Sequence, residues 1–211
     1  FSQVASSALA WLQTNDPERA LEASLSALMS RSTTLRFLAQ HVCRMHGSDS
    51  RAVYLAAIGS QPVVALAGLG EVGDVRDADL VSTYLNASRP SERAAATTAP
   101  GRLAGRSAEE RVSEMLADSS PRGARSASWA LIRMGATPAT IERVWEMAVP
   151  LRSPGLRKAA FRLFGSGGRW TALRLACRGI GSDDADLDAR CRDLLANCMR
   201  AWNQSFTSPP A

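Results

Sequence analysis

The sequence predicts an all-α protein, a right-handed superhelical solenoid of antiparallel helix pairs, on the basis of three observations. A small–apolar–x–x–apolar–small pattern occurs four times, and its copies begin 34, 31 and 30 residues apart at Ala65, Ala99, Ala130 and Ala160. A second recurrence pairs ERVSEM at 110–115 with ERVWEM at 142–147, at a spacing of 32 residues. No segment alternates apolar and polar residues between hairpin turns, so we expect no strands. A period of this length is typical of stacked helical repeats.

Residues 1–59 are predicted to form helices of degenerate N-terminal repeats. Asp16 and Pro17 are the capping residue and the first-turn proline of a helix over residues 18–29. Further helices are expected over residues 35–46 and 50–58, each followed by a glycine.

Residues 60–181 are predicted to be the core of the repeat array, with two helices in each period. Pro121, Pro138 and Pro154 each follow a Ser or Thr, which is the pattern of a helix start. Gly135 and Gly165 are expected to end the first helix of their periods.

The expected second helix after Pro138 has one apolar face. Ile141, Val144, Trp145 and Ala148 fall at i, i+3, i+4 and i+7. We therefore interpret Trp145 as a core residue rather than a ligand-binding one.

Residues 182–203 are predicted to be a closing helix, and residues 204–211, with Pro209 and Pro210, a flexible tail. Asp183, Asp184, Asp186 and Asp188 lie at the start of this helix. They lack the glycine and glutamate of a calcium loop, so we interpret them as carboxylates at the positive end of a helix.

The proline near each helix start, the arginines Arg93, Arg125 and Arg157, and the Ala-Leu-x-x-apolar-Gly ending resemble the bacterial HEAT-like repeat family. The resemblance covers roughly residues 60–197. It departs at Pro100 and Gly101, where a kink or an early helix end is expected. The resemblance implies a protein-binding scaffold. A DNA glycosylase family built from similar repeats implies the alternative of a nucleic-acid-binding or base-processing protein.

The sequence predicts no catalytic residues, no metal site and no cofactor. His41, Cys43 and His46 match a metal-ligand pattern, but on one helix they point in different directions and cannot converge on an ion. The segment AGLGEVG at 67–73 matches a dinucleotide-binding fingerprint but follows no strand and falls on a helix end. We therefore expect a scaffold without enzymatic activity.

The four cysteines, Cys43, Cys177, Cys191 and Cys198, lack a close pairing and are interpreted as buried apolar residues, as in a cytoplasmic protein. No apolar run approaches the length of a bilayer span, so no membrane partner is expected. The chain begins with Phe1 rather than Met, which is compatible with a piece of a longer protein.

The formal net charge of +5 is unevenly distributed along the chain. Residues 89–181 hold 16 Lys and Arg against 7 Asp and Glu, a balance of +9, whereas residues 1–88 and 182–211 each have a balance of −2. This basic block favours a protein partner with an acidic segment; nucleic acid is the second possibility, and solvated helix faces are the alternative without a ligand.

Three arginines recur at equivalent positions of successive second helices, just before an apolar core residue. They are Arg111, Arg143 and Arg174, and Arg169, Trp170 and Arg178 lie on the third of these helices. We expect the three arginines to form a row along one face and to bind an anionic ligand. The alternative is that Arg111 and Arg143 only pair with Glu114 and Glu146, three residues on, whereas Arg174 has no such partner.

Overall fold

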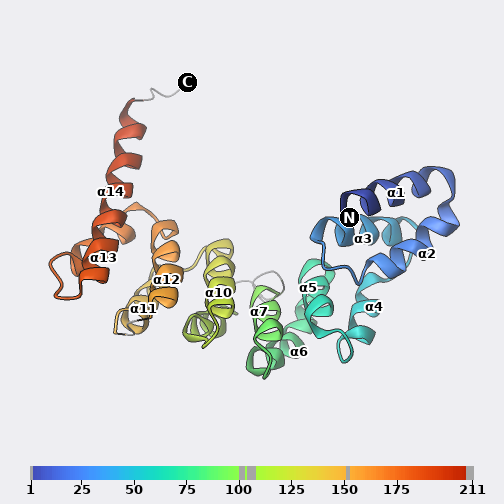
Figure 1. Cartoon of the computed structure of the whole chain (residues 1–211), viewed down its shortest axis with the longest axis horizontal. Coiled ribbons are helices and arrows are strands. Elements are labelled where there is room, and N and C mark those ends of the chain that lie inside the picture. Colours follow the sequence, from blue (N-terminus) through green and yellow to red (C-terminus); the bar gives the residue numbers. More distant parts are fainter. Residues whose placement is uncertain (1, 100–102, 104–107, 151–152, 208–211) are drawn as a thin grey trace. The chain divides into compact units, whose positions relative to one another are not determined.

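The computed structural model describes residues 2–99, 103, 108–150 and 153–207 (Figure 1). It forms two compact units, Phe1–Ala104 and Gly105–Ala211. The division therefore falls inside the segment predicted to be the repeat core, and the expected boundaries at 59/60 and 181/182 stay predictions. Pro100 and Gly101 lie outside the described residues.

The described part of both units is helical and contains no strand, which confirms the predicted fold class. The first unit contains α1 (Ser2–Asn15), α2 (Pro17–Ala27), α3 (Thr33–Met45), α4 (Ser50–Ala57), α5 (Pro62–Val72), η1 (Val75–Asp77), α6 (Ala78–Thr83), η2 (Tyr84–Asn86) and α7 (Pro90–Thr98). The second contains α9 (Glu109–Glu114), η4 (Met115–Ala117), α10 (Pro121–Met134), α11 (Pro138–Ala148), α12 (Pro154–Ser166), α13 (Arg169–Gly179) and α14 (Ala185–Thr207). Within residues 1–59, which were predicted to be helical, α1 is the helix for which no range was predicted.

Proline starts the helices as predicted, because its fixed φ suits the first turn and its missing N–H is not needed there. Pro121 begins α10, Pro138 begins α11 and Pro154 begins α12. Gly135 ends α10 in the left-handed conformation, with φ 67°. Gly165 was wrongly expected to end its helix: it lies within α12, which continues to Ser166 and has Gly167 at its C-cap.

First helices pack side by side within each unit, α5 on α7 and α10 on α12 (Figure 1). This is the stacking of helix pairs that the sequence period predicts. In the second unit the core is formed by fully buried side chains of α10, α11 and α12, including Leu131, Ile141, Val144, Leu163 and Phe164.

Trp145 is 4% exposed and belongs to this core, as predicted. Its ring centroid lies 5.5 Å from that of Phe164 and 6.2 Å from that of Phe161. Three large rings thus fill the space between α11 and α12.

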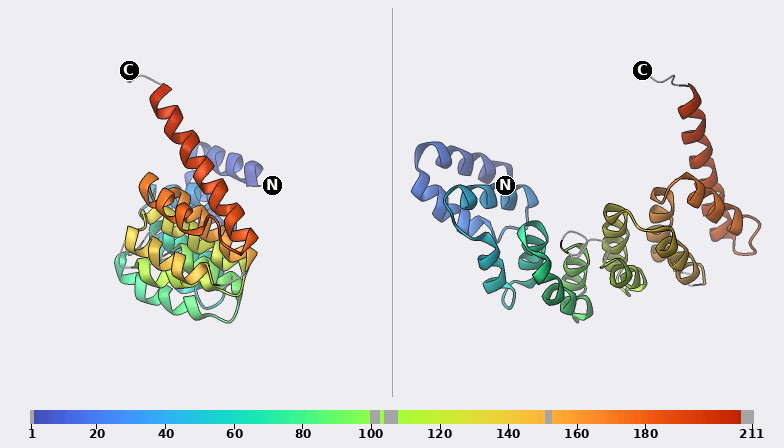
Figure 2. Two further views of the ribbon diagram at one scale, coloured as in Figure 1. Left: turned by 90° about the vertical axis from the view of Figure 1, so that its left-hand side faces the viewer. Right: turned by 180° about the vertical axis from the view of Figure 1, so that it is seen from behind.

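The last helix, α14, begins at Ala185, three residues after the predicted start at 182, and runs to Thr207, so residues 204–207 are helical rather than part of a tail. The first half of α14 packs into the core through the buried side chains of Leu187, Cys191 and Leu194. Its second half extends past α12 and α13 (Figure 2), and Met199 there is 52% exposed.

Candidate functional site

The predicted arginine row lies on the second helices α9, α11 and α13, with Arg111, Arg143 and Arg174 all exposed. Two of the three are paired with a glutamate of the preceding second helix. Arg143 Nη1 lies 2.8 Å from Glu110 Oε1, and Arg174 forms an ion pair with Glu142. Arg174 was expected to lack a partner; this expectation is wrong because the partner comes from another helix.

Arg178 joins the same network. Its guanidinium lies 2.7 Å from Glu142 Oε2 and 2.5 Å from Glu146 Oε1, and 5.4 Å above the Trp145 ring. The hydrogen bond to Glu146 raises the pKa of Arg178 above its usual value. Ion pairs on this face therefore connect neighbouring helix pairs, instead of joining residues three apart on one helix.

The charges of this face nearly cancel. Arg111, which makes no ion pair with any residue the structure describes, is the one arginine of the row that stays uncompensated. The other members are neutralised by carboxylates at hydrogen-bonding distance, and such exposed pairs attract an outside anion weakly.

Arg169 and Trp170, the remaining predicted site residues, lie beside α14. Trp170 is 69% exposed, and its ring packs edge to face on Trp202 with centroids 5.6 Å apart. The guanidinium of Arg169 lies 5.4 Å from the Trp202 ring. These residues form an aromatic cluster at the α13–α14 contact.

Uncompensated positive charge gathers on the first helices instead. Neither α10 nor α12 contains an acidic residue, so all acids of the second unit lie on other elements or loops. We define the basic surface as the side chains of Arg122, Arg125, Lys158 and Arg162. Within the described ranges none of the four forms an ion pair.

Two shallow grooves lie on the basic surface. The first, between α10 and α12, has a volume of about 350 Å³ and is lined by Pro121, Arg125, Gly155, Lys158, Ala159 and Arg162. The second, between α12 and α14, has a volume of about 290 Å³ and is lined by Lys158, Phe161, Arg162, Arg190, Asp193, Leu194 and Asn197. Lys158 and Arg162 border both grooves, so α12 forms the ridge between them.

Aromatic contact orients one cation of the basic surface. The guanidinium of Arg162 lies 5.2 Å from the ring centroid of the half-exposed Trp129. A cation–π contact of this kind leaves the guanidinium charge uncompensated, while it limits the positions that the side chain adopts.

The sequence pattern groups Arg125 with Arg93 and Arg157, and the structure corrects this alignment. Arg93 and Arg157 are each the fourth residue of their helix, whereas Arg125 is the fifth residue of α10. Arg125 is therefore equivalent to Lys158, the fifth residue of α12. The sequence contains a signal for this equivalence, because Arg125 and Lys158 lie at the same distance from the prolines that start their helices.

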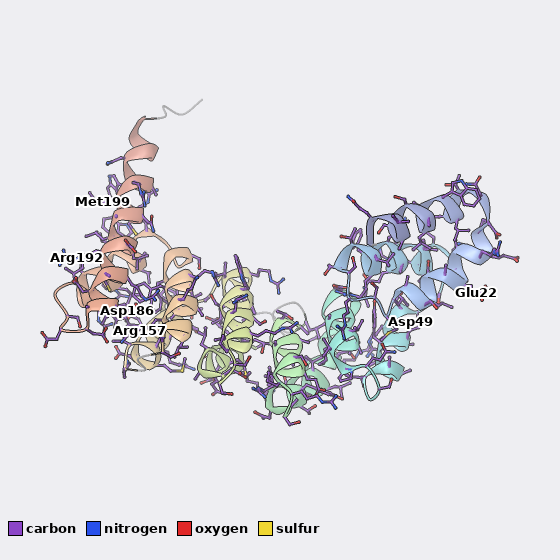
Figure 3. All side chains as sticks on the ribbon, viewed as in Figure 1. Glu22, Asp49, Arg157, Asp186, Arg192 and Met199 are labelled. Carbon is purple, nitrogen blue, oxygen red and sulfur yellow. The ribbon has the colours of Figure 1, made fainter. Side chains whose placement is uncertain are left out.

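Arg157 has a structural role. Its side chain is 4% exposed and lies 2.7 Å from Asp184 and 3.1 Å from Asp186 at the start of α14. Arg157 and Asp186 are labelled in Figure 3. Arg157 also donates to the Val149 carbonyl at 2.9 Å. The acidic run thus lies at the start of the closing helix, as predicted, and two of its carboxylates bind α14 to α12.

The residues of the metal-like pattern lie on α3 and its end. Cys43 is buried, whereas His41 and His46 are exposed. No group of three or more His, Cys, Asp or Glu in the described residues is arranged to hold a metal ion.

The cysteines were all expected to be buried, and this is wrong for two of them. Cys43 and Cys191 are buried, and burial raises the pKa of the Cys191 thiol to about 11. Cys177 is exposed on α13 and Cys198 is half-buried on α14. Whether a lone cysteine is buried depends on how its helix packs, which the surrounding sequence pattern does not show.

Comparison with known proteins gives structural similarity only. No protein-family model matches the sequence, and no curated protein does so. The fold is similar to a crystal structure of an engineered protein, with 13% identity, 93% of this chain and 96% of that chain covered, and a TM-score of 0.49. It is also similar to the archaeal HEAT-like repeats protein of Thermococcus onnurineus NA1, with 10% identity, coverage of 94% and 92%, and a TM-score of 0.44.

No helix in the described part of the chain combines the length and the apolar character needed to cross a membrane.

Proposed function

We propose that the chain is a non-enzymatic scaffold that binds an acidic segment of a partner protein, and that it does so through the basic surface. The observation that carries this proposal is the concentration of uncompensated cations on two packed helices that contain no acidic residue. A carboxylate that reaches Arg125, Lys158 or Arg162 displaces no resident carboxylate. It therefore keeps the full gain of a charge-assisted hydrogen bond.

The arginine row is less suited to this role. An acidic ligand would have to compete there with Glu110, Glu142 and Glu146, which already hold Arg143, Arg174 and Arg178. The row instead supports the scaffold, because its ion pairs join residues of successive helix pairs.

The limited extent of the basic surface favours a protein segment over nucleic acid. Its free cations lie on two helices, and α14 borders it with Asp193, a carboxylate that would repel a continuous phosphate backbone. A duplex needs several aligned phosphate contacts for useful affinity.

The test is fluorescence anisotropy with a labelled glutamate-rich peptide. We expect Lys158→Glu to weaken binding by roughly tenfold or more, because one contact to a charged group is worth about 1.5–3 kcal/mol. Arg111→Glu is the matched control, because it reverses the charge of one exposed arginine of the row that has no ion pair among the described residues. It should leave the affinity unchanged apart from a small change in long-range electrostatic attraction. Circular dichroism should show equal helicity for both variants.

Three results would contradict the proposal. Absence of measurable peptide binding would exclude acidic-segment recognition. A loss on Arg111→Glu rather than Lys158→Glu would assign binding to the arginine row. Tighter binding of a labelled DNA duplex, lost on Lys158→Glu, would favour nucleic acid as the ligand of this surface.

A further inference from the structure

The two grooves on either side of α12 differ in chemistry. The first is lined by three cations and by small or apolar residues without a carboxylate: Pro121, Arg125, Gly155, Lys158, Ala159 and Arg162. The second contains Asp193 and an apolar floor in addition to its cations. The two grooves therefore suit different kinds of side chain.

Gly155 keeps the first groove open. A Cβ placed on Gly155 would have Pro121 Cβ, at 3.9 Å, as its only close neighbour, so space remains above the backbone. Arg125 and Lys158 border this space and have no intramolecular carboxylate among the described residues. A Glu or Asp side chain entering here would find cations on both sides.

The second groove fits an apolar side chain. Leu194 is 6% exposed and Phe161 is half-buried, with the Phe161 ring 5.2 Å from that of Phe164, so both are anchored in the core. Arg190 is held at 3.0 Å by Asp186, and Asp193 adds a negative charge that no described residue neutralises. Asp193 offsets part of the attraction that Lys158 and Arg162 exert on a second carboxylate, whereas an aliphatic side chain would cover Phe161 and Leu194.

The width of α12 limits the spacing of the two side chains. Packed helices lie about 8–10 Å apart, so grooves on opposite sides of one helix are separated by about that distance. An α-helix places residues i and i+7 on the same face with a rise of about 10.5 Å. In an extended segment, residues on one face are about 6.6 or 13 Å apart, and both values lie further from the groove separation than the helical value does.

We infer that the basic surface binds an amphipathic acidic helix of the partner protein, laid across α12. An acidic side chain occupies the first groove, and an aliphatic side chain seven residues away occupies the second. This inference rests on the proposed function and adds the conformation and the pattern of the ligand. The surface thereby discriminates against uniform polyanions, including nucleic acids.

The test compares labelled helical peptides of equal length and net charge on an Ala/Gln background. One carries Glu and Leu at i and i+7, the second carries them at i and i+5, which turns them to different faces, and the third replaces Leu by Gln. We expect the i,i+7 peptide to bind at least about tenfold more tightly than the other two, a difference of about 1.4 kcal/mol.

Two variants test the grooves separately. Gly155→Leu fills the first groove without changing charge and should abolish the preference for Glu over Gln in the peptide. Asp193→Arg should raise the affinity for a peptide with Glu at both positions. It should also reduce the difference in affinity by which Leu is preferred over Glu at the second position. Thermal unfolding shows whether either variant has lost its fold, and the Asp193→Arg result stands even where Gly155→Leu is unstable.

Equal affinity for the i,i+7 and i,i+5 peptides, or no effect of Leu, would overturn the inference while leaving acidic-segment binding intact. If no acidic peptide binds, the proposed function itself is wrong. If Asp193→Arg leaves the preference for Leu over Glu at the second peptide position unchanged, the second groove takes no part in binding.

Discussion

At the scale of single residues, an arginine at the fourth position of a first helix links neighbouring helix pairs. Arg36, Arg93 and Arg157 are the fourth residues of α3, α7 and α12, and each donates to a carbonyl of the loop before its helix. Arg36 and Arg157 also pair with carboxylates of a later element, Glu71 and Asp184. One planar guanidinium thus satisfies a loop carbonyl and attaches the next helix pair.

Arg157→Ala is expected to destabilise the second unit by roughly 2–3 kcal/mol, because it removes a buried guanidinium that bonds to Asp184, Asp186 and the Val149 carbonyl. Arg192→Ala, which removes an exposed pair with Asp188, should cost only about 0.3–0.5 kcal/mol. Denaturant unfolding of both variants measures the difference. Equal losses would show that Arg157 is not a principal attachment of α14.

Acid is expected to destabilise the first unit through Asp77. The hydrogen bond from Arg51 holds the pKa of Asp77 below its ordinary value, which is about 3.9 in an unfolded chain. A depressed folded-state pKa stabilises the protein above the unfolded pKa, and this contribution is lost as pH falls through the folded pKa. Stability should therefore decline below about pH 5. In Arg51→Met, denaturant titrations across this range should show a shallower decline; an identical decline would exclude this pair as the cause.

At the scale of elements, close helix contact depends on small residues at particular positions. A Cβ on Gly68 of α5 would lie 2.2 Å from the ring of the fully buried Tyr54 on α4, which is too close for two carbons. The first glycine of the fingerprint-like segment AGLGEVG is therefore explained by packing of α4 on α5.

Gly68→Ala should lower the free energy of unfolding by about 1–3 kcal/mol, because overlap with Tyr54 exceeds the gain in helix propensity. Gly59→Ala is the control, since a Cβ there meets nothing within 4 Å. It should be neutral or stabilise by up to about 1 kcal/mol. Thermal melts of the two variants give the comparison, and a more stable Gly68→Ala protein would contradict the packing argument.

At the scale of the whole molecule, stability is expected to be local to each unit, because stacked repeats contact only their neighbours. Cys43 is buried in the first unit and Cys191 in the second, so each thiol reports the opening of its own unit.

Pulsed thiol labelling with mass spectrometry, across a denaturant series, should detect this separation. Gly68→Ala should expose Cys43 at a lower denaturant concentration and leave the Cys191 transition nearly in place; Arg157→Ala should do the reverse. The exposed Cys177 should react without denaturant in every variant. Simultaneous, equal shifts of Cys43 and Cys191 would show that the units unfold as one.

The sequence by itself determined the helical class, the period and most helix starts, because prolines, caps and apolar spacing act within a few residues of one another. It also placed Trp145 in the core. Only the tertiary structure decided which arginines are available to a ligand. The partners of Arg143 and Arg178 lie 33 and 32–36 residues away in the chain. Local spacing cannot show such pairs. Among the described residues, Arg122, Arg125, Lys158 and Arg162 of α10 and α12 are cations left without them.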